Sequence, residues 1–171
     1  MDATDLFDDA LSRVPEAVRG AIDGLDGEAL RWRPAPGANP IGWLVWHLTR
    51  EQDAQVADLC GVEELWTQQG WVDRFELPAG ANDHGYGWSS EQVDGLEVPD
   101  AEVLLDHLVA VSARCRELIA DLGPDDLDRV IDDSYDPPVT VGARLVSVVD
   151  DAAQHAGQAG YVRGLIDARD G

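Results

Sequence analysis

Apolar residues recur at alternating steps of three and four along four stretches of the chain, which is the spacing of one face of an α-helix. The first stretch spans residues 7–25, with the apolar positions Phe7, Leu11, Val14, Val18, Ala21 and Leu25. Pro15 lies inside it. Because proline removes a backbone donor and clashes with the preceding turn, we expect a kink or a break near Arg13.

The second stretch follows a connector at residues 26–39 that is rich in turn-forming residues. We expect Asn39 to be its N-cap and Pro40 its first-turn proline. The apolar positions that would face the core are Ile41, Leu44, Val45 and Leu48. His47 falls beside this stripe, so it should border the core rather than face water.

Two further helices are predicted in the second half of the chain. The third ends before Gly123 and Pro124, and its stripe consists of Leu104, Leu108, Val111, Cys115, Leu118 and Leu122. Thr140 can cap the fourth, whose stripe consists of Val141, Leu145, Val148, Ala152, His155, Ala159, Val162 and Ile166. With no convincing β alternation, the pattern predicts an all-α protein, a four-helix bundle in a single domain over residues 1–171.

A long crossover at residues 61–100 joins the second and third helices and has no sustained period. Short helical pieces are expected at residues 62–68 and 89–96. The crossover is rich in aromatic residues and glycine, namely Trp66, Trp71, Gly80, Gly85, Tyr86, Gly87 and Trp88. We expect a lid over one end of the bundle, since aromatic rings bury large areas and glycine allows sharp turns.

The composition excludes some classes of partner. The 171 residues carry a formal net charge of -22, from 34 acidic and 12 basic residues, and every basic residue is Arg. Such a surface repels phosphates and anionic lipids, so we expect no nucleic-acid or membrane partner. No apolar run approaches the length of a membrane span and the first residues are acidic, so a cytoplasmic protein is expected. Cys60 and Cys115 lack metal-binding spacing and should be reduced, buried thiols.

The strongest chemical signal is the pair Asp151 and His155, four residues apart on one face of the fourth helix. With His47 they make three candidate metal ligands, and three ligands with an open position are typical of a reactive metal site. The alternative is a buried histidine bonded to an acid without metal. Gln158, on the same face, would bond a ligand or make a plain polar contact.

Several other side chains are candidates for a substrate pocket. His84 in the glycine-rich loop is a candidate lid contact, whereas His107 is more typical of a structural residue. Trp43 and Tyr86 are candidate pocket-lining residues, although aromatic residues at such positions more often serve the core.

Two segments carry a resemblance to a known family: GLDGEALRWRPAPGANPIGWLVWHLTREQD at residues 24–53 and DDAAQHAGQAGYVRG at residues 150–164. Together they resemble the DinB-like superfamily, and particularly its actinobacterial branch related to mycothiol-dependent maleylpyruvate isomerases and thiol S-transferases. The resemblance implies an up-up-down-down four-helix bundle. It also implies a divalent metal, zinc or alternatively nickel, bound by His47, Asp151 and His155. Arg163 matches a family arginine that would meet an anionic substrate or brace the helix.

The resemblance implies a metal-dependent S-transferase or isomerase that uses a low-molecular-weight thiol as co-substrate and acts on a small electrophile. Two alternatives stay open. One is a non-catalytic metal-binding or stress-response protein. The other is a metal-dependent hydrolase with Glu51 as base, although an exposed helical Glu is the simpler interpretation of that residue. The resemblance and the glycines of the fourth helix also suggest a homodimer.

Overall fold

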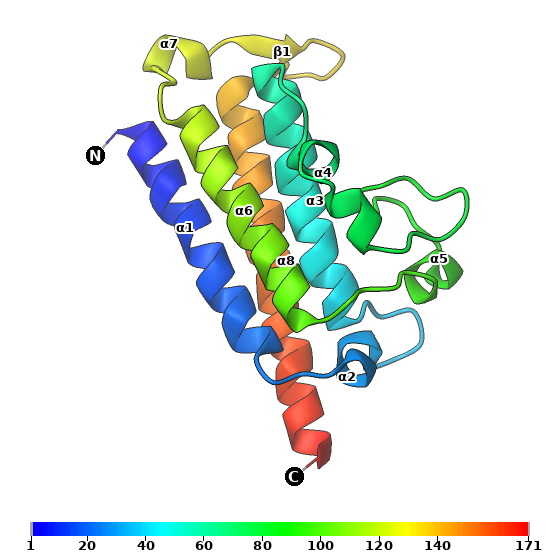
Figure 1. Ribbon diagram of the computed structural model, residues 1–171. Coiled ribbons are helices and arrows are strands. Elements are labelled where there is room, and N and C mark those ends of the chain that lie inside the picture. Colours follow the sequence, from blue (N-terminus) through cyan, green and yellow to red (C-terminus); the bar gives the residue numbers. More distant parts are fainter. Residues whose placement is uncertain (1, 171) are drawn as a thin grey trace.

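Four long helices form a bundle in the computed structural model, which describes residues 2–170 (Figure 1). They are α1 (Ala3–Ile22), α3 (Ile41–Cys60), α6 (Ala101–Ile119) and α8 (Val141–Asp170). The remaining described residues form short helices, loops and one small two-stranded sheet. The prediction of an all-α four-helix bundle is therefore confirmed.

Contacts between helix ends define the directions of the four helices. Arg163, late in α8, donates to the carbonyl oxygen of Asp23 just after α1 at 2.6 Å, so α1 and α8 run in the same direction. The thiol of Cys60, the last residue of α3, lies 3.9 Å from the carbonyl oxygen of Leu118 near the end of α6, so these two helices are also parallel. Arg116 of α6 pairs with Asp8 at the start of α1, which makes the two pairs antiparallel.

The up-up-down-down order expected from the resemblance is wrong. Along the chain, α1 points one way, α3 and α6 the other way, and α8 again the first way (Figure 1). The cause lies in the connections, because each of the two shorter connectors, at residues 23–40 and 120–140, reverses the direction of the chain and leads to the helix diagonally across the bundle. Consecutive parallel helices need a long crossover, and an up-up-down-down bundle needs two. This chain has one, between α3 and α6.

Helix α1 passes through Pro15 without a break, so of the kink or break expected near Arg13 the break is wrong. Because proline has no N–H, the carbonyl oxygen of Leu11 loses its normal partner within the helix. The hydroxyl of Ser112 on α6 donates to that oxygen at 3.4 Å and replaces the missing bond. Tertiary packing thus compensates for a residue that local propensity alone would place at a helix end.

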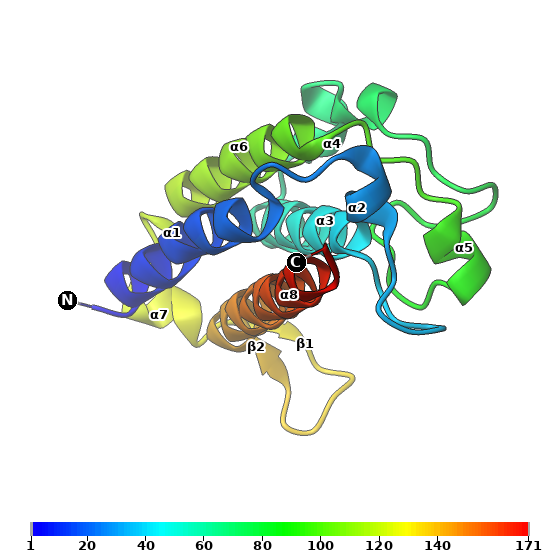
Figure 2. The ribbon, with the colours of Figure 1, turned by 90° about the horizontal axis from the view of Figure 1, so that it is seen from below.

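Helix α3 is the centre of the molecule, and every residue from Ile41 to Arg50 is buried. It begins one residue later than expected, with Pro40 rather than Asn39 at the N-cap and no side-chain capping bond. Helix α8 packs on one side of it and the crossover on the other (Figure 2). His47, 4% exposed, is buried in the middle of this helix.

The crossover lies along the flank of α3 rather than over one end of the bundle, which corrects the expected position of the lid (Figure 2). It contains α4 (Leu65–Gln68), the 3-10 helix η1 (Trp71–Arg74) and α5 (Ser90–Asp94). The rings of Trp66 and Trp88 pack against Trp46 of α3, with centroid distances of 6.4 and 5.0 Å. A short helix, α2 (Gly27–Arg31), also forms in the first connector.

The connector between α6 and α8 holds α7 (Pro124–Leu127) and two antiparallel strands, β1 (Val130–Asp132) and β2 (Val139–Thr140). Strands this short leave no alternating pattern, so they were not predictable from periodicity. Thr140 accepts a bond from the backbone N–H of Ala143 at 3.2 Å, as expected for a residue that caps α8.

The two thiols and His107 lie on the inner sides of their helices to different degrees. Cys60 and Cys115 are free, and Cys115 is buried as expected, whereas Cys60 at the end of α3 is only partly buried. His107 is fully buried against the ring of Trp71, at a centroid distance of 4.8 Å.

Among the described helices, none has the length and apolar content that crossing a bilayer requires. The outward glycines of α8, such as Gly160, have open space around them, and the homodimer stays a prediction.

Candidate metal centre

The packing of α3 against α8 brings His47, Asp151 and His155 together, and we call these three residues the metal triad. One potential ligand atom from each lies within 4.8 Å of the other two. The fourth helix can approach α3 closely here because the residue between the two ligands on its inner face, Ala152, is small and fully buried. The spacing of four along α8 and the facing position on α3 thus converge as the sequence predicted.

Each histidine of the triad has a hydrogen bond at its Nδ1 atom, and this bond turns the other ring nitrogen, Nε2, toward the centre of the triad. The Nδ1 atom of His47 bonds to the backbone carbonyl oxygen of His84. The Nδ1 atom of His155 lies 2.9 Å from the amide oxygen of Gln158. A carbonyl oxygen only accepts, so Nδ1 carries the proton in each ring and Nε2 keeps its lone pair. Metal-binding histidines are oriented in this way in proteins generally.

The two histidines differ in their affinity for a proton. Burial lowers the pKa of His47, which outweighs the bond to His84. For His155, burial also acts to lower the pKa, but the nearby Asp151 carboxylate and the bond to Gln158 outweigh it and raise the value. His47 therefore stays neutral at pH 7, while a proton on His155 competes with any cation for Nε2.

The triad fits a divalent metal ion because it leaves a negative group without compensation. The Oδ2 atom of Asp151 is buried and has no hydrogen-bond partner among the described residues. Its Oδ1 atom lies 3.4 Å from Nε2 of His155, which is long for a hydrogen bond. A simple bonded Asp–His pair would not leave a buried carboxylate oxygen unpaired, whereas a cation at the centre would satisfy it.

A tightly bonded loop closes one side of the triad. The side-chain oxygen of Asn82 accepts bonds from the backbone of Gly85 at 2.7 Å and from the indole of Trp88 at 3.0 Å. Gly85 has φ +89°, and a Cβ there would lie 2.9 Å from the ring of Trp46 and 3.1 Å from Nδ1 of His47. Only glycine therefore allows the loop to approach α3 so closely that the His84 carbonyl reaches His47.

An open cavity of about 290 Å³ lies beside the triad, with His47 and Asp151 in its wall. Its other lining residues are Glu51, Gln55, Tyr86, Ser147, Asp150 and Gln154. A metal ion held by the triad would thus be accessible from one side. Three protein ligands and access for a fourth group are the arrangement of a reactive site.

The candidate pocket residues fall into different positions. Trp43 stacks on the ring of His47, with a centroid distance of 4.4 Å and an interplanar angle of 15°, so it supports the His47 ring from behind the cavity wall. His84 contacts His47 through its backbone and Glu51 through its ring, while Tyr86 lines the cavity. Arg163 lies elsewhere, bonded to Asp167 and to carbonyl groups at the end of α1. Its position supports the bracing role and gives no support to a substrate contact at the triad.

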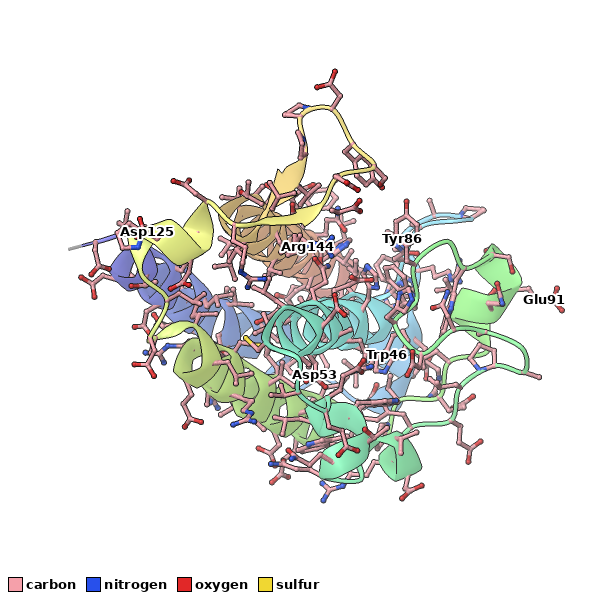
Figure 3. The ribbon with its side chains drawn as sticks, turned by 90° about the horizontal axis from the view of Figure 1, so that it is seen from above. Trp46, Asp53, Tyr86, Glu91, Asp125 and Arg144 are labelled. Atoms are coloured by element: carbon pink, nitrogen blue, oxygen red, sulfur yellow. The ribbon has the colours of Figure 1, made fainter. Side chains whose placement is uncertain are left out.

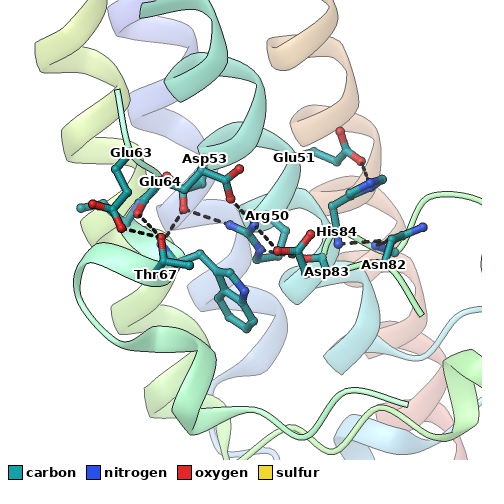
Figure 4. Close-up of polar contacts among 12 residues, drawn as sticks. Arg50, Glu51, Asp53, Glu63, Glu64, Thr67, Asn82, Asp83 and His84 are labelled. Atoms are coloured by element: carbon teal, nitrogen blue, oxygen red, sulfur yellow. Dashed lines mark hydrogen bonds and ion pairs between the residues drawn. The ribbon is translucent and has the colours of Figure 1, made fainter. Parts of the chain in front are cut away.

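The interpretation of Glu51 as an exposed helical residue is wrong. Its side chain is 15% exposed, because the loop at residues 82–88 covers it. Nδ1 of His84 bonds to one of its oxygens at 3.0 Å (Figure 4). The amide of Gln55 donates to the other oxygen at 2.7 Å. Its place in the cavity wall depends on a long-range contact, which helical periodicity does not reveal.

A second buried polar group on α3, absent from the sequence predictions, is the Arg50 cluster of Arg50, Asp53, Glu64 and Asp83 (Figure 4). The guanidinium is fully buried and bonds to Asp53 at 2.9 Å, to Glu64 at 2.5 Å and to the carbonyl oxygen of Asp83 at 2.8 Å. It also lies 4.6 Å above the ring of Trp66. The cluster attaches both ends of the segment 64–83 to α3, directly before the loop that covers the triad.

The fold and the site together define a helical-bundle protein with a candidate His–Asp–His metal centre open to a cavity. The chain belongs to the DinB superfamily, which matches residues 10–159. Among solved structures, it is similar to one described as "Crystal structure of the conserved protein of locus from Enterococcus faecalis". The TM-score is 0.91 and the identity 32%, over 98% of this chain and 99% of the other. No curated protein matches significantly.

These comparisons confirm the predicted superfamily. The more specific assignment to an actinobacterial, mycothiol-related branch stays a prediction, because the matches identify the superfamily alone.

Proposed function

We propose that this protein is a metal-dependent enzyme in which a low-molecular-weight thiol of the mycothiol type attacks a small electrophile, as an S-transferase or an isomerase. The observation that supports the proposal most is the triad itself, three ligands beside an open cavity. Support for a thiol as the nucleophile comes from the resemblance of residues 24–53 and 150–164 to thiol-dependent members of the superfamily.

His47, Asp151 and His155 would hold the ion. Two imidazole nitrogens and one carboxylate oxygen suit zinc, with nickel as the alternative. When bound, such an ion acts as a Lewis acid and lowers the pKa of a thiol. Gln158 and the His84 carbonyl keep both rings oriented, and the loop at residues 82–88 keeps water from the buried side of the triad.

Glu51 is the group placed to take up a proton from the nucleophile. It lines the same cavity as His47 and Asp151, and bonds from His84 and Gln55 fix its carboxylate there. A fixed carboxylate beside a metal centre is the usual arrangement of a general base.

The position of Glu51 also favours a second candidate function, metal-dependent hydrolysis. In that reaction water replaces the thiol as nucleophile and Glu51 accepts its proton. The two candidates share every residue of the site and differ only in the nucleophile. A non-catalytic metal-binding protein would need the triad alone and have no use for Glu51.

Turnover by untagged protein loaded with zinc distinguishes the three functions. We expect loss of thiol in the presence of an electrophile, loss of this activity with a chelator, and recovery when zinc is restored. The matched variant Glu51→Gln keeps the shape of the side chain and removes the base, and should lower kcat while zinc content stays constant. Hydrolysis of esters without thiol consumption would favour the second function. Stoichiometric zinc without either reaction would contradict catalysis.

A further inference from the structure

The cavity beside the metal triad is strongly acidic. Glu51, Asp150 and Asp151 contribute three carboxylates to its wall, and none of the described residues that line it is an arginine. The chain also contains no lysine. Three carboxylates exceed the two positive charges of a divalent ion, so the cavity stays negative with the metal bound.

Two of these carboxylates are held in place by glutamine side chains one helical turn away. The amide of Gln55 donates to Glu51 at 2.7 Å, and the amide of Gln154 donates to Asp150 at 2.7 Å. A carboxylate that turned freely into water would contribute little to selectivity. These bonds keep Glu51 and Asp150 in the cavity wall, and the amide oxygens add further acceptors.

An aromatic ring stands at the mouth of the same cavity. Tyr86 is 75% exposed, yet its backbone is fixed, since its carbonyl oxygen accepts a bond from the amide of Asn82 at 2.9 Å. Figure 3 shows Tyr86 on the side of the molecule where the crossover loop approaches α8. An exposed ring beside carboxylates attracts cations, because the face of an aromatic ring carries partial negative charge.

We infer that the ligand that enters this cavity is a small molecule carrying an ammonium group, and that the cavity rejects carboxylate-bearing molecules of the same size. The inference rests on the proposed function in that it specifies the ligand class of the same site. Glu51, Asp150 and the ring of Tyr86 are not metal ligands and provide evidence separate from the triad, while Asp151 belongs to both the triad and the acidic wall.

Two thiols of similar size and opposite charge, cysteamine and 3-mercaptopropionate, test this selectivity on the cobalt(II)-loaded protein. The sulfur-to-cobalt absorption band reports binding. We expect cysteamine to bind more tightly than 3-mercaptopropionate in wild type. In Asp150→Asn this preference should fall about tenfold, because the loss of one carboxylate weakens the binding of the cation about threefold and favours the binding of the anion about threefold at cavity distances in water. The fall should disappear at 1 M salt. Intrinsic differences between the two thiols cancel when wild type and variant are compared.

Matched variants control for charge and for the ring. Asp125→Asn changes the net charge of the protein equally but lies on α7, across the bundle from Tyr86, and should leave the ratio unchanged (Figure 3). Tyr86→Leu should lower the preference for cysteamine, and Tyr86→Phe should retain it, because phenylalanine keeps the aromatic face. An unchanged ratio in Asp150→Asn would overturn the inference and leave the proposed function intact.

The rate at which chelators remove the metal separates the failure of this inference from the failure of the proposed function. If neither thiol produces the band, thiol chemistry is contradicted, and the chelators still decide the selectivity. Pyridine-2,6-dicarboxylate, which is anionic, should remove the metal about threefold faster from Asp150→Asn than from wild type. Neutral 1,10-phenanthroline should remove it at the same rate from both. Equal acceleration of both chelators, or of neither, would overturn the inference, and protein that takes up no metal would overturn both proposals.

Discussion

The metal triad and the Arg50 cluster lie within one turn of each other on α3, yet they are satisfied in opposite ways. In the Arg50 cluster, three nitrogens of the guanidinium have oxygen partners, and both oxygens of Asp53 also accept backbone N–H groups of α4, at 3.0 and 2.8 Å. In the triad, a buried oxygen of Asp151 lacks a partner among the described residues. Buried polar groups are normally paired, so the first cluster is complete by itself, whereas the second leaves a carboxylate oxygen that a ligand could pair.

The comparison shows that burial alone does not identify a functional residue. Arg50 is more deeply buried than His47, at 0% against 4% exposure, but its bonds are all made within the protein, one to Asp53 on α3 and two to the crossover. In the triad, by contrast, an oxygen of Asp151 has no partner among the described residues, and His47 and Asp151 line an open cavity. Variants of the Arg50 cluster should therefore change the stability of the fold, and variants of the triad should change metal binding.

The largest effect is expected for Arg50→Ala. The substitution leaves Asp53 buried without its cation, and breaking a buried ion pair from one side costs about 3–5 kcal/mol of the free energy of unfolding. Urea denaturation followed by circular dichroism measures it. The control is Arg116→Ala, which breaks a solvent-exposed pair with Asp8 and should change stability little. Equal effects of the two variants would contradict the structural role of the Arg50 cluster.

The second effect is expected for His155→Ala, which removes a metal ligand. The affinity for zinc should fall more than about 100-fold, since even the loss of a residue that only orients a ligand costs about 10–100-fold. Competition with a chromophoric chelator and elemental analysis provide the measurement. The neighbouring variant Gln154→Ala should keep its zinc. Full occupancy in His155→Ala, with the fold intact, would exclude the triad as the metal site.

The third effect is expected for Gly85→Ala, which acts on the loop between the two clusters. A Cβ at this position meets Trp46 at 2.9 Å while φ is +89°, so the loop must move away from α3 at a cost of about 1–3 kcal/mol. The His84 carbonyl then leaves His47, and zinc affinity should fall as well. Gly87→Ala is the matched control, because Gly87 also has a positive φ but has no atom within 4 Å of a built Cβ. A similar loss of zinc affinity in both variants would indicate backbone strain rather than loss of the close approach.

The smallest effect is expected from pH. Because the pKa of His155 is raised by Asp151 and Gln158, its protonated form competes with zinc up to a higher pH than an ordinary histidine would. Below that pKa the zinc affinity should fall about tenfold per pH unit, and above it the affinity should level off. Removing a bond that favours the proton, in Gln158→Ala, should shift the midpoint of this profile to lower pH. An unshifted midpoint would contradict the role of Gln158.

The sequence predicts the triad because each part of it is local or periodic. Asp151 and His155 are one turn apart on a regular helix, and His47 lies beside the apolar stripe of another. Packing the two stripes together is enough to bring the three residues into one place. The four long helices are predictable for the same reason, since their stripes extend over several turns.

The Arg50 cluster and the buried position of Glu51 follow from contacts with the crossover, where periodicity gives no information. Arg50 and Glu51 lie off the apolar stripe of α3, and periodicity alone would place such residues in solvent. In the structure, the segment 64–84 covers both side chains. The continuous helix at Pro15 has the same cause, because the hydroxyl that replaces its missing bond belongs to α6. Long-range contacts of irregular segments are the part of this structure that local rules miss.

The bond from His47 to the backbone of residue 84 has a thermodynamic consequence. A loop rather than a helix orients His47, so the ordering of this loop is coupled to the affinity of the triad for zinc. Such a coupling of two equilibria is reciprocal. Zinc uptake should slow amide hydrogen exchange at residues 82–88 by the same factor by which an ordered loop tightens zinc binding. Exchange rates of a surface segment would thereby measure the occupancy of a buried centre.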